Sequence, residues 1–260
     1  MLCCPVCGQS LVRLQAVSRC ENGHSFDIAK EGYVNLLRSA KSGDKIGDDK
    51  QSARCRRDFL NKGYYSVLRD KLVATFQNAN GTLLDICCGE GYYTSAIGNQ
   101  TSLEVYGFDI SREMVRLASK RGGGTYFVAN MASIPVKDAS FDFATHLFAP
   151  FNEKAFAKIL KPGGKLYTVI PGSRHLFGLK EAVYDTPYCN DELLPKTEIL
   201  KLSGIERVDS EILLQTPEDI DAVFRMTPYY FHTSQKDKEK LSEYSFLRTE
   251  ISFVIGCYEK

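Results

Sequence analysis

The fold of this chain is decided by the stretch Leu83-Leu84-Asp85-Ile86-Cys87-Cys88-Gly89-Glu90-Gly91-Tyr92-Tyr93-Thr94. It starts as a short apolar strand, continues into a turn with Gly89 and Gly91, and should then enter a helix. Glycines at such a place let a ligand pack directly against the backbone. The next predicted strand ends in Asp109, an acid that can accept hydrogen bonds from both hydroxyls of a ribose. The stretch therefore predicts a nucleoside site where the first strand ends.

Outward from this turn, apolar strands alternate with helical segments such as 112–121. The strands expected after the first lie at 105–109, 125–129, 141–147 and 165–170, the last of them after a Lys-Pro-Gly-Gly turn. This alternation favours an α/β fold with a doubly wound, mostly parallel sheet. Residues 251–258 alternate in polarity as an edge strand should. Apolar residues recur at helical steps over 53–78, which predicts a helix before the sheet.

Two cofactor classes use a glycine turn of this kind. A dinucleotide needs a third glycine three residues after the second, and that position is Thr94 here. S-adenosylmethionine has no phosphate and needs only the close approach to the backbone, with Asp85 placed to face the methionine ammonium. The pattern therefore favours S-adenosylmethionine.

A second motif lies near the N-terminus, in Cys4, Cys7, Cys20 and His24. Two Cys-containing pairs with short internal spacing supply four N/S ligands, which is the set that structural zinc prefers. Cys3 allows a different register, but Cys4 fits the tight turn better. We therefore predict a Zn²⁺ site with these four ligands.

Length and composition bound the organisation of the chain. The 260 residues allow one large domain and a small module, and 43% hydrophobic with 25% charged residues is ordinary for a globular protein. We expect a zinc-binding domain over 1–37, a flexible linker over 38–52 and a methyltransferase domain over 53–260. Nine cysteines without a disulfide pattern, no signal peptide and no long apolar run are what a cytoplasmic protein would show.

Charge is uneven along the chain. The net charge is +1, but residues 1–80 hold 13 Lys and Arg against 8 Asp and Glu. A solvated surface is one explanation, and contact with a polyanion such as nucleic acid is the other. We expect the zinc module and the arginines at 54, 56 and 57 to contact phosphates of an RNA.

With these motifs the chain resembles the bacterial 23S rRNA (guanine-N1)-methyltransferases. The resemblance covers roughly the first 180 residues and is most specific in the string His24–Leu37; the other matching segments are Cys4–Cys7, Gly89–Thr94 and Pro171–Leu176. It implies a Rossmann-like class I methyltransferase fold, a zinc-ribbon-like N-terminal domain, methylation of guanine N1 in a hairpin loop of 23S rRNA, and a homodimer. It also implies a possible influence on macrolide susceptibility.

The resemblance further implies roles for single residues. Cys4, Cys7, Cys20 and His24 match the zinc ligands of the family; the matching cofactor contacts are Tyr65, Tyr93, Thr94 and His175. One departure is Cys87, which stands where the family turn has its first glycine. A positive φ there would strain the backbone.

Several residues keep two interpretations at this stage. His175 and Asn130 follow predicted strands and His146 lies at the end of one, so each could serve the site or be structural. We assign Asn130 to the adenine and leave the residue that manages the guanine N1 proton open. Phe148 and its neighbours could form a wall for a flipped guanine or belong to the core. Two alternatives to the rRNA enzyme also remain: a methyltransferase for a small metabolite, and a zinc RNA-binding protein with a decayed catalytic domain.

Overall fold

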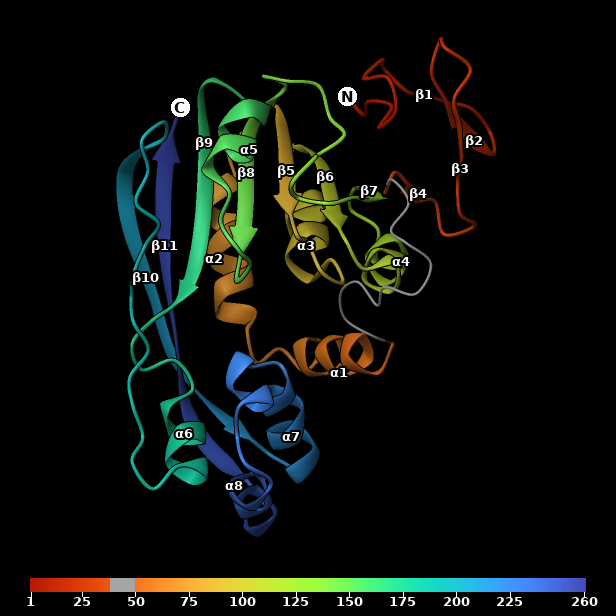
Figure 1. The fold of residues 1–260 in the computed structure, drawn as a ribbon. Helices are drawn as coiled ribbons and strands as arrows, with labels where there is room; N and C mark the ends of the chain where they lie inside the picture. Colours follow the sequence, from red (N-terminus) through yellow and green to blue (C-terminus); the bar gives the residue numbers. More distant parts are fainter. Residues whose placement is uncertain (38–49) are drawn as a thin grey trace.

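The computed structural model describes residues 1–37 and 50–260 (Figure 1). Its strands are β1 (Val12–Arg13), β2 (Val17–Arg19), β3 (Ser25–Asp27), β4 (Val34–Asn35), β5 (Thr82–Ile86), β6 (Glu104–Asp109), β7 (Thr125–Val128), β8 (Phe141–Leu147), β9 (Leu160–Pro171), β10 (Lys201–Leu214) and β11 (Leu247–Glu259). Its helices are α1 (Lys50–Asn61), α2 (Ser66–Phe76), α3 (Tyr92–Gln100), α4 (Arg112–Arg121), α5 (Glu153–Ile159), α6 (Phe177–Val183), α7 (Pro217–Arg225), η1 (Pro228–Phe231), α8 (Gln235–Glu239) and η2 (Lys240–Glu243). Within these described residues no helix has the length and apolar character needed to cross a membrane.

The main sheet has eight strands in the order β10-β11-β9-β8-β5-β6-β7-β4. The pairs from β9 to β4 are parallel, whereas β11 runs antiparallel to both β9 and β10. The strand order reverses at β5, which lies between β6 and β8. Ligands of such sheets bind beyond the carboxyl ends of the strands at this point, so the topology places the site next to the glycine turn.

Both faces of the sheet are covered, which explains why β5 reads as a continuous apolar run. All five of its residues are buried. Leu83 belongs to a hydrophobic cluster with residues of α2 and α3, and Leu84 belongs to another cluster with Phe156 of α5. Alternate side chains therefore enter opposite cores, and the predicted doubly wound, mostly parallel sheet is confirmed.

The helix predicted over 53–78 is wrong as a single element. The chain forms α1 and α2 instead, and the break between them holds Gly63 at a φ of 82°. The amide of Gly63 donates to Leu60 O over 3.0 Å, and the amide of Ser66 donates to Gly63 O over 2.9 Å. This turn changes the direction of the chain between the two helices (Figure 1). Residues 38–49 of the predicted linker lie outside the described residues, and α1 begins at Lys50.

The prediction of an edge strand at 251–258 is also wrong. β11 lies inside the sheet, and β10, which the sequence reading missed, forms the edge. The mostly exposed pattern of β10 explains the miss, since only Leu214 is buried. The segment 215–246 between β10 and β11, here called the insertion, carries α7, η1, α8 and η2 below the sheet (Figure 1).

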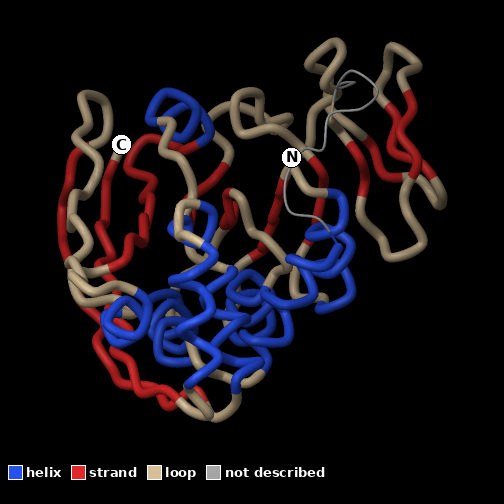
Figure 2. Tube along the Cα trace, turned by 60° about the horizontal axis from the view of Figure 1, so that its bottom comes forward, coloured by secondary structure: helices blue, strands red, loops and turns tan. Residues whose placement is uncertain are grey.

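The N-terminal region forms a separate three-stranded antiparallel sheet, β1-β2-β3. Figure 2 shows it beside the main body, at the end of the sheet that carries β4. β4 pairs with β7, so the last part of the predicted zinc domain is a strand of the main sheet. A second link is the hydrogen bond from the amide of Cys3 to Pro135 O, 2.8 Å long.

Candidate metal centre and cofactor site

The side chains of Cys4, Cys7, Cys20 and His24 converge, with all four ligand atoms within 4.8 Å of one another. Cys7 Sγ lies 3.7 Å from Cys20 Sγ, and Cys20 Sγ lies 3.4 Å from His24 Nδ1. Zinc–sulfur bonds of about 2.3 Å in a tetrahedron place two sulfurs about 3.8 Å apart. The cluster therefore fits a structural zinc ion with a Cys₃His ligand set.

Two tight turns hold these ligands. Gly8, at a φ of 76°, donates its amide to Cys4 O over 2.8 Å, and Gly23, at a φ of 81°, donates to Cys20 O over 3.0 Å. A hydrogen bond from the Gln9 backbone lowers the pKa of the Cys7 thiol to about 6, which favours the thiolate that zinc binds. Cys3 is not a member of the cluster.

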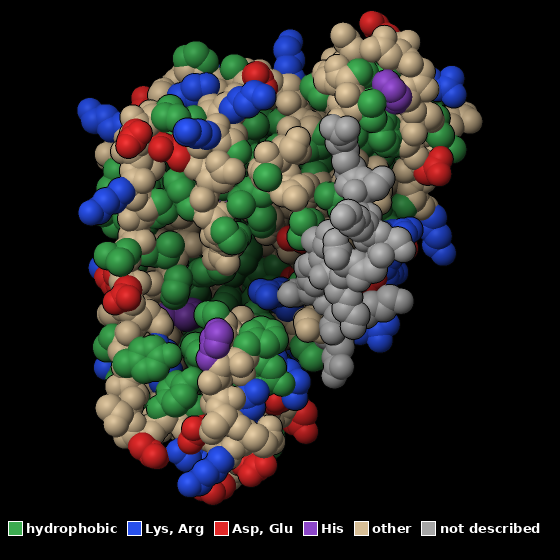
Figure 3. Space-filling model, in the orientation of Figure 1, with side chains coloured by type: hydrophobic (Ala, Val, Ile, Leu, Met, Phe, Trp, Pro, Cys, Tyr) green, Lys and Arg blue, Asp and Glu red, His purple; other side chains and the backbone are tan. Residues whose placement is uncertain are grey.

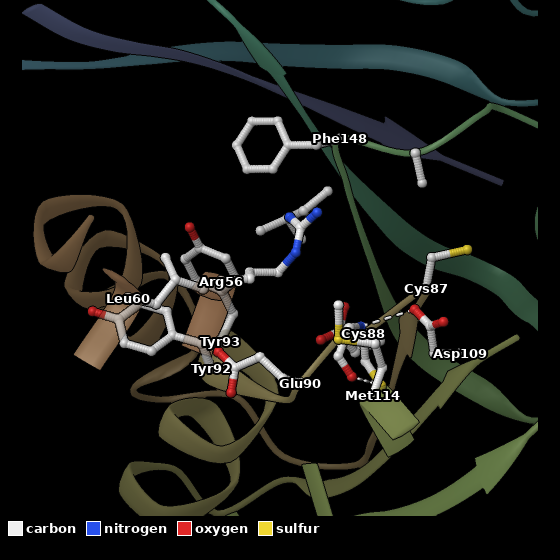
Figure 4. Close-up of a pocket in the computed structure, with 14 residues that line it drawn as sticks. Arg56, Leu60, Cys87, Cys88, Glu90, Tyr92, Tyr93, Asp109, Met114 and Phe148 are labelled. Atoms are coloured by element: carbon white, nitrogen blue, oxygen red, sulfur yellow. Dashed lines mark hydrogen bonds between the residues drawn. The ribbon is translucent and has the colours of Figure 1, made fainter. Parts of the chain in front are cut away.

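A cavity of about 230 Å³, here called the first cavity, opens at the carboxyl ends of β5 and β6 (Figure 4). Its lining comes from α1, the glycine turn, the start of α3 and the end of β8: Arg56, Leu60, Asp85, Cys87–Glu90, Tyr92, Tyr93, Asp109, Met114 and Leu147–Ala149. A Cβ built on Gly89 would meet no heavy atom within 4 Å, so the turn leaves open space there for a ligand. Gly91 has another role, since a Cβ there would lie 2.8 Å from Ala118 Cβ of α4.

Three acids, Asp85, Glu90 and Asp109, line the first cavity. Asp109 Oδ2 accepts from the Gly89 amide over 3.0 Å, and its Oδ1 accepts from the Ser111 amide over 2.8 Å. These bonds fix a carboxylate that has further lone pairs for ribose hydroxyls. Asp85 is buried, and burial raises the pKa of its carboxyl to about 6. Thr145 Oγ1 donates to Asp85 Oδ1 over 2.8 Å.

Thr94 and Tyr93 of α3 point to different surroundings. Thr94 is fully buried outside both cavities, and its hydroxyl donates to Asp85 Oδ2. Thr94 therefore fixes the position of Asp85, which lines the first cavity. Tyr93 lines the first cavity, and its hydroxyl is buried with no hydrogen-bond partner among the described residues. An orphaned buried hydroxyl at a cavity wall fits a site that a polar ligand completes.

The predicted strain at the glycine turn is present. Cys87, which lines the first cavity, has a φ of 58°, in the left-handed region that favours glycine. Burial raises the pKa of its thiol to about 12, so it stays a neutral, small side chain.

A larger cavity of about 520 Å³, here called the second cavity, adjoins the first and shares Arg56, Phe148 and Ala149 with it. Its remaining lining comes from α1, from the ends of β8 and β9, and from the insertion: Ser52, Cys55, Tyr65, Ile170, Pro171, His175, Leu176, Asn190, Val223, Arg225–Tyr229 and Phe231. Two of the residues predicted to contact the cofactor, Tyr65 and His175, thus lie beyond the shared wall.

Tyr65 and His175 form a pair whose protons can be placed. The amide of Ser252 donates to His175 Nδ1 over 3.2 Å, and His175 Nε2 lies 3.1 Å from Tyr65 Oη. Burial lowers the pKa of His175 to about 4, so the neutral ring carries its proton on Nε2 and donates to Tyr65. The hydroxyl hydrogen of Tyr65 is thereby left for a ligand.

Asn130 and His146, the remaining sequence candidates, make contacts within the protein and line neither cavity. Asn130 is exposed, lines neither cavity and accepts from the Ala132 amide over 2.9 Å. His146 is 2% exposed, and its Nε2 lies 3.1 Å from Pro150 O. Burial lowers the pKa of His146 to about 4.

The three arginines of α1 do not act alike. Arg56 lines both cavities instead of facing outward, whereas Arg54 is exposed and Arg57 pairs with Asp58 at 2.7 Å. The helical spacing of α1 carried this signal, because residues one or two positions apart on a helix do not share a face.

Comparison with known proteins agrees with this geometry. Residues 2–41 match the family model of the RlmA N-terminal zinc ribbon, and residues 83–164 match a methyltransferase domain model. A 23S rRNA (guanine(748)-N(1))-methyltransferase from Streptomyces fradiae is 33% identical over 69% of this chain and 66% of its own length.

Two further relatives carry the same guanine-N1 methyltransferase name as provisional assignments. The one from Micromonospora griseorubida is 30% identical over 68% of this chain and 67% of its own length. The one from Bacillus subtilis is 30% identical over 72% and 70%, respectively. The alignments therefore span about two thirds of the relatives' lengths. Among solved structures, a provisionally assigned methyltransferase from Bacillus halodurans superposes with a TM-score of 0.50 at 14% identity, over 74% of this chain and 98% of its own, which supports the fold alone.

Proposed function

This chain belongs to the 23S rRNA (guanine-N1)-methyltransferase family, and from that premise we propose that it methylates N1 of a guanine in a hairpin loop of 23S rRNA. It is an S-adenosylmethionine-dependent methyltransferase with a zinc ribbon. The observation that carries the proposal is the presence in one chain of the Cys₃His cluster and of a nucleoside cavity at the strand-order reversal. A small-metabolite enzyme has no evident use for the first of these.

The cofactor site that we propose uses Asp85, Gly89, Tyr93 and Asp109 around the first cavity, while Gly91 supports the turn by allowing its close approach to Ala118 of α4. Asp109 would accept from the ribose hydroxyls, and the open backbone at Gly89 would allow close approach. Thr94 would act through Asp85. When bound, S-adenosylmethionine supplies a methyl group that is activated by a positively charged sulfur. Tyr65, which lines the second cavity and is oriented by His175, would donate to the methionine carboxylate at the junction of the two cavities. We omit Asn130 from this set, because its side chain caps its own turn.

RNA recognition is assigned to the N-terminal module. Residues 1–37 would contact RNA, and 53–260 would carry the chemistry. Arg13 and Arg19 are exposed on its small sheet, and Arg54 is exposed on α1. A folded loop is a better target than a duplex, because duplex RNA hides its base edges in a deep groove. Steep weakening of binding between low and moderate salt is the expected result.

Three consequences follow for the cell and the assembly. We place the enzyme in the cytoplasm with the ribosomal subunit, as a homodimer, and we expect its loss to change macrolide susceptibility. The edge strand β10, on which Leu202 and Ile205 are exposed, is a surface that a second copy would protect. Sedimentation at micromolar concentration and inhibitory concentrations in a deletion strain test these points.

The direct test is transfer of a radiolabelled methyl group to unmodified 23S rRNA, followed by mapping of reverse-transcriptase stops. Methylation at N1 blocks Watson–Crick pairing, so a new stop next to a loop guanine is expected. Transfer without such a stop would contradict the N1 assignment. Absence of transfer to rRNA by a protein that binds the cofactor would favour a small-metabolite substrate.

A further inference from the structure

The second cavity is built as a site for a planar aromatic group. Phe148 is 44% exposed and lies with its ring centroid 5.8 Å from that of Phe253, while Tyr229 and Phe231 face the cavity from the insertion. Figure 3 shows a hollow lined largely by hydrophobic side chains between the sheet and the insertion. Flat aromatic and apolar walls are the surroundings that an extruded base meets in enzymes that modify bases.

Contacts with the rest of the chain fix the position of the insertion, and with it the aromatic side chains that face the second cavity. Asp219 of α7 accepts from Tyr64 Oη over 2.8 Å and pairs with Lys62, and both partners lie in the turn between α1 and α2. Arg225 is held by Asp221 at 2.6 Å and by Tyr230 Oη at 3.0 Å. The contacts of Asp219 therefore join the insertion to the turn between α1 and α2, and those of Arg225 hold the insertion together internally.

Arg56 stands at the junction of the two cavities and lines both. Figure 4 shows its guanidinium group reaching between Phe148 and the tyrosines of α3. Burial raises the pKa of Tyr65, Tyr93 and Glu90, and the charge of Arg56 lies close enough to oppose that rise in each. The positive charge of Arg56 therefore acts electrostatically on a ligand that lies between the two cavities.

Of the ring nitrogens of His175 and His146, one lacks a hydrogen-bond partner among the described residues, and this is the buried Nδ1 of His146. His175 accepts from Ser252 and donates to Tyr65, and His146 is buried against Pro150. Among the described lining residues of the second cavity there is no Asp or Glu, and its two cations are Arg56 and Arg225. The other titratable or charged groups that line the two cavities with Arg56 are Asp85, Cys87, Cys88, Glu90, Tyr92, Tyr93 and Asp109 in the first, and Cys55, Tyr65, His175, Arg225 and Tyr229 in the second.

We propose that the second cavity receives the target guanine and that Arg56 is a catalytic residue, whose charge stabilises the guanine after loss of its N1 proton. This inference rests on the proposed function. The N1–H bond breaks first, its proton passes to water at the cavity mouth, and the electron pair stays on the ring, shared between N1 and O6. The pair on N1 would then form the N1–methyl bond as the sulfur–methyl bond breaks, and the two electrons of that broken bond would go to the sulfur.

The test compares wild type, R56M and R56K in single-turnover methylation of unmodified 23S rRNA between about pH 6.5 and about pH 9.5. Cofactor affinity is measured for each by calorimetry. R248M is the matched control, because Arg248 is exposed, lines neither cavity and makes a 3.3 Å pair with Glu211. If R56M does not fold, as judged by circular dichroism, R56K and R56Q replace it in the comparison.

We expect R56M to bind the cofactor within about threefold of wild type and to react about a hundredfold more slowly near pH 7. Its deficit should shrink as the pH rises, because alkaline solution then removes the N1 proton that Arg56 no longer helps to release. R56K, which keeps the charge without the planar group, should be intermediate.

Two results would overturn the inference while the wild type remains active on guanine N1. One is a deficit of R56M that stays constant over the whole pH range. The other is a deficit that disappears at saturating cofactor, which would make Arg56 a cofactor ligand. An inactive wild type would overturn the proposed function, and this inference with it.

Discussion

The zinc module and the main sheet are stabilised in different ways, the first by its metal ligands and the second by buried side chains. Among residues 1–30 only Cys4, Ser18 and Cys20 are buried, and two of these three are zinc ligands. In β5, by contrast, every residue is buried between two hydrophobic clusters. The comparison teaches that the metal takes the place of a core in the module, as expected for a segment too small to bury enough apolar surface.

The zinc module and the main domain are nevertheless joined through residues 31–35, here called the seam. Tyr33 Oη accepts from Arg112 Nε of α4 over 3.0 Å, and Ser119 Oγ donates to Glu31 O over 2.7 Å. β4 completes the seam by pairing with β7. Loss of the metal should therefore unfold the part before this seam and leave the sheet intact.

The largest effect should follow from removing one zinc ligand. C20S should unfold residues 1–30, because structural zinc contributes on the order of 10 kcal/mol to the folding of such a module. Limited proteolysis should cleave before Tyr33 in C20S and leave 53–260 resistant. C3S is the matched control, since Cys3 lies outside the cluster. A C20S protein that resists protease over its whole length would break the comparison.

Low pH should destabilise the main sheet through protonation of the buried His146. Burial lowers the pKa of His146 to about 4, below its ordinary value of 6.5, so the folded protein takes up this proton less readily than the unfolded chain. The stability that neutral His146 contributes is complete above about pH 6.5 and is lost as pH falls toward about 4, a change of about 3 kcal/mol.

Urea unfolding of wild type and H146Q at pH 7 and pH 4 measures this difference. Asp85 changes stability in the opposite sense, because its raised pKa of about 6 favours the folded state as pH falls through that value, but it is common to both proteins. H232Q is the control, since His232 is exposed. Equal acid sensitivity of H146Q and wild type would contradict the assignment.

Asp109 should show that the cofactor site depends on the sheet and not on zinc. D109N removes the charge and one acceptor from a side chain that receives the amides of Gly89 and Ser111. The dissociation constant for S-adenosylmethionine should rise about tenfold to a hundredfold. Zinc content should stay at one ion per chain. The surface variant D138N should bind the cofactor like wild type, and a D109N protein that does so too would remove Asp109 from the site.

The smallest effect should come from the strained turn. C87G places glycine where φ is 58°, and relief of the left-handed strain should raise the free energy of unfolding by up to about 1 kcal/mol. A139G, at a φ of 47° and exposed outside both cavities, is the reference for the same relief away from the site. Thermal unfolding that gives a gain for A139G but a loss for C87G would mean that the Cys87 side chain packs favourably.

The sequence predicted what depends on local pattern. β8 was expected at 141–147 and α4 at 112–121, and both have these bounds, because the alternation of apolar strands and helical segments is a local signal. The spacing of the three cysteines and the histidine in the sequence predicted the zinc cluster equally well. The second cavity was not, because Tyr65, Phe148 and Tyr229 come from three distant segments. The position of β10 outside β11 also escaped, since an exposed edge strand carries little apolar pattern.

The central claim is that one chain divides its labour, with the zinc module needed for RNA and the sheet sufficient for the cofactor. The most direct measurement pairs cofactor calorimetry with reverse-transcriptase mapping of 23S rRNA for wild type and C20S. We predict that wild type and C20S bind S-adenosylmethionine with the same affinity. Only wild type should produce a reverse-transcriptase stop at a methylated guanine N1. A stop of equal strength with C20S, or loss of cofactor binding in C20S, would contradict this division.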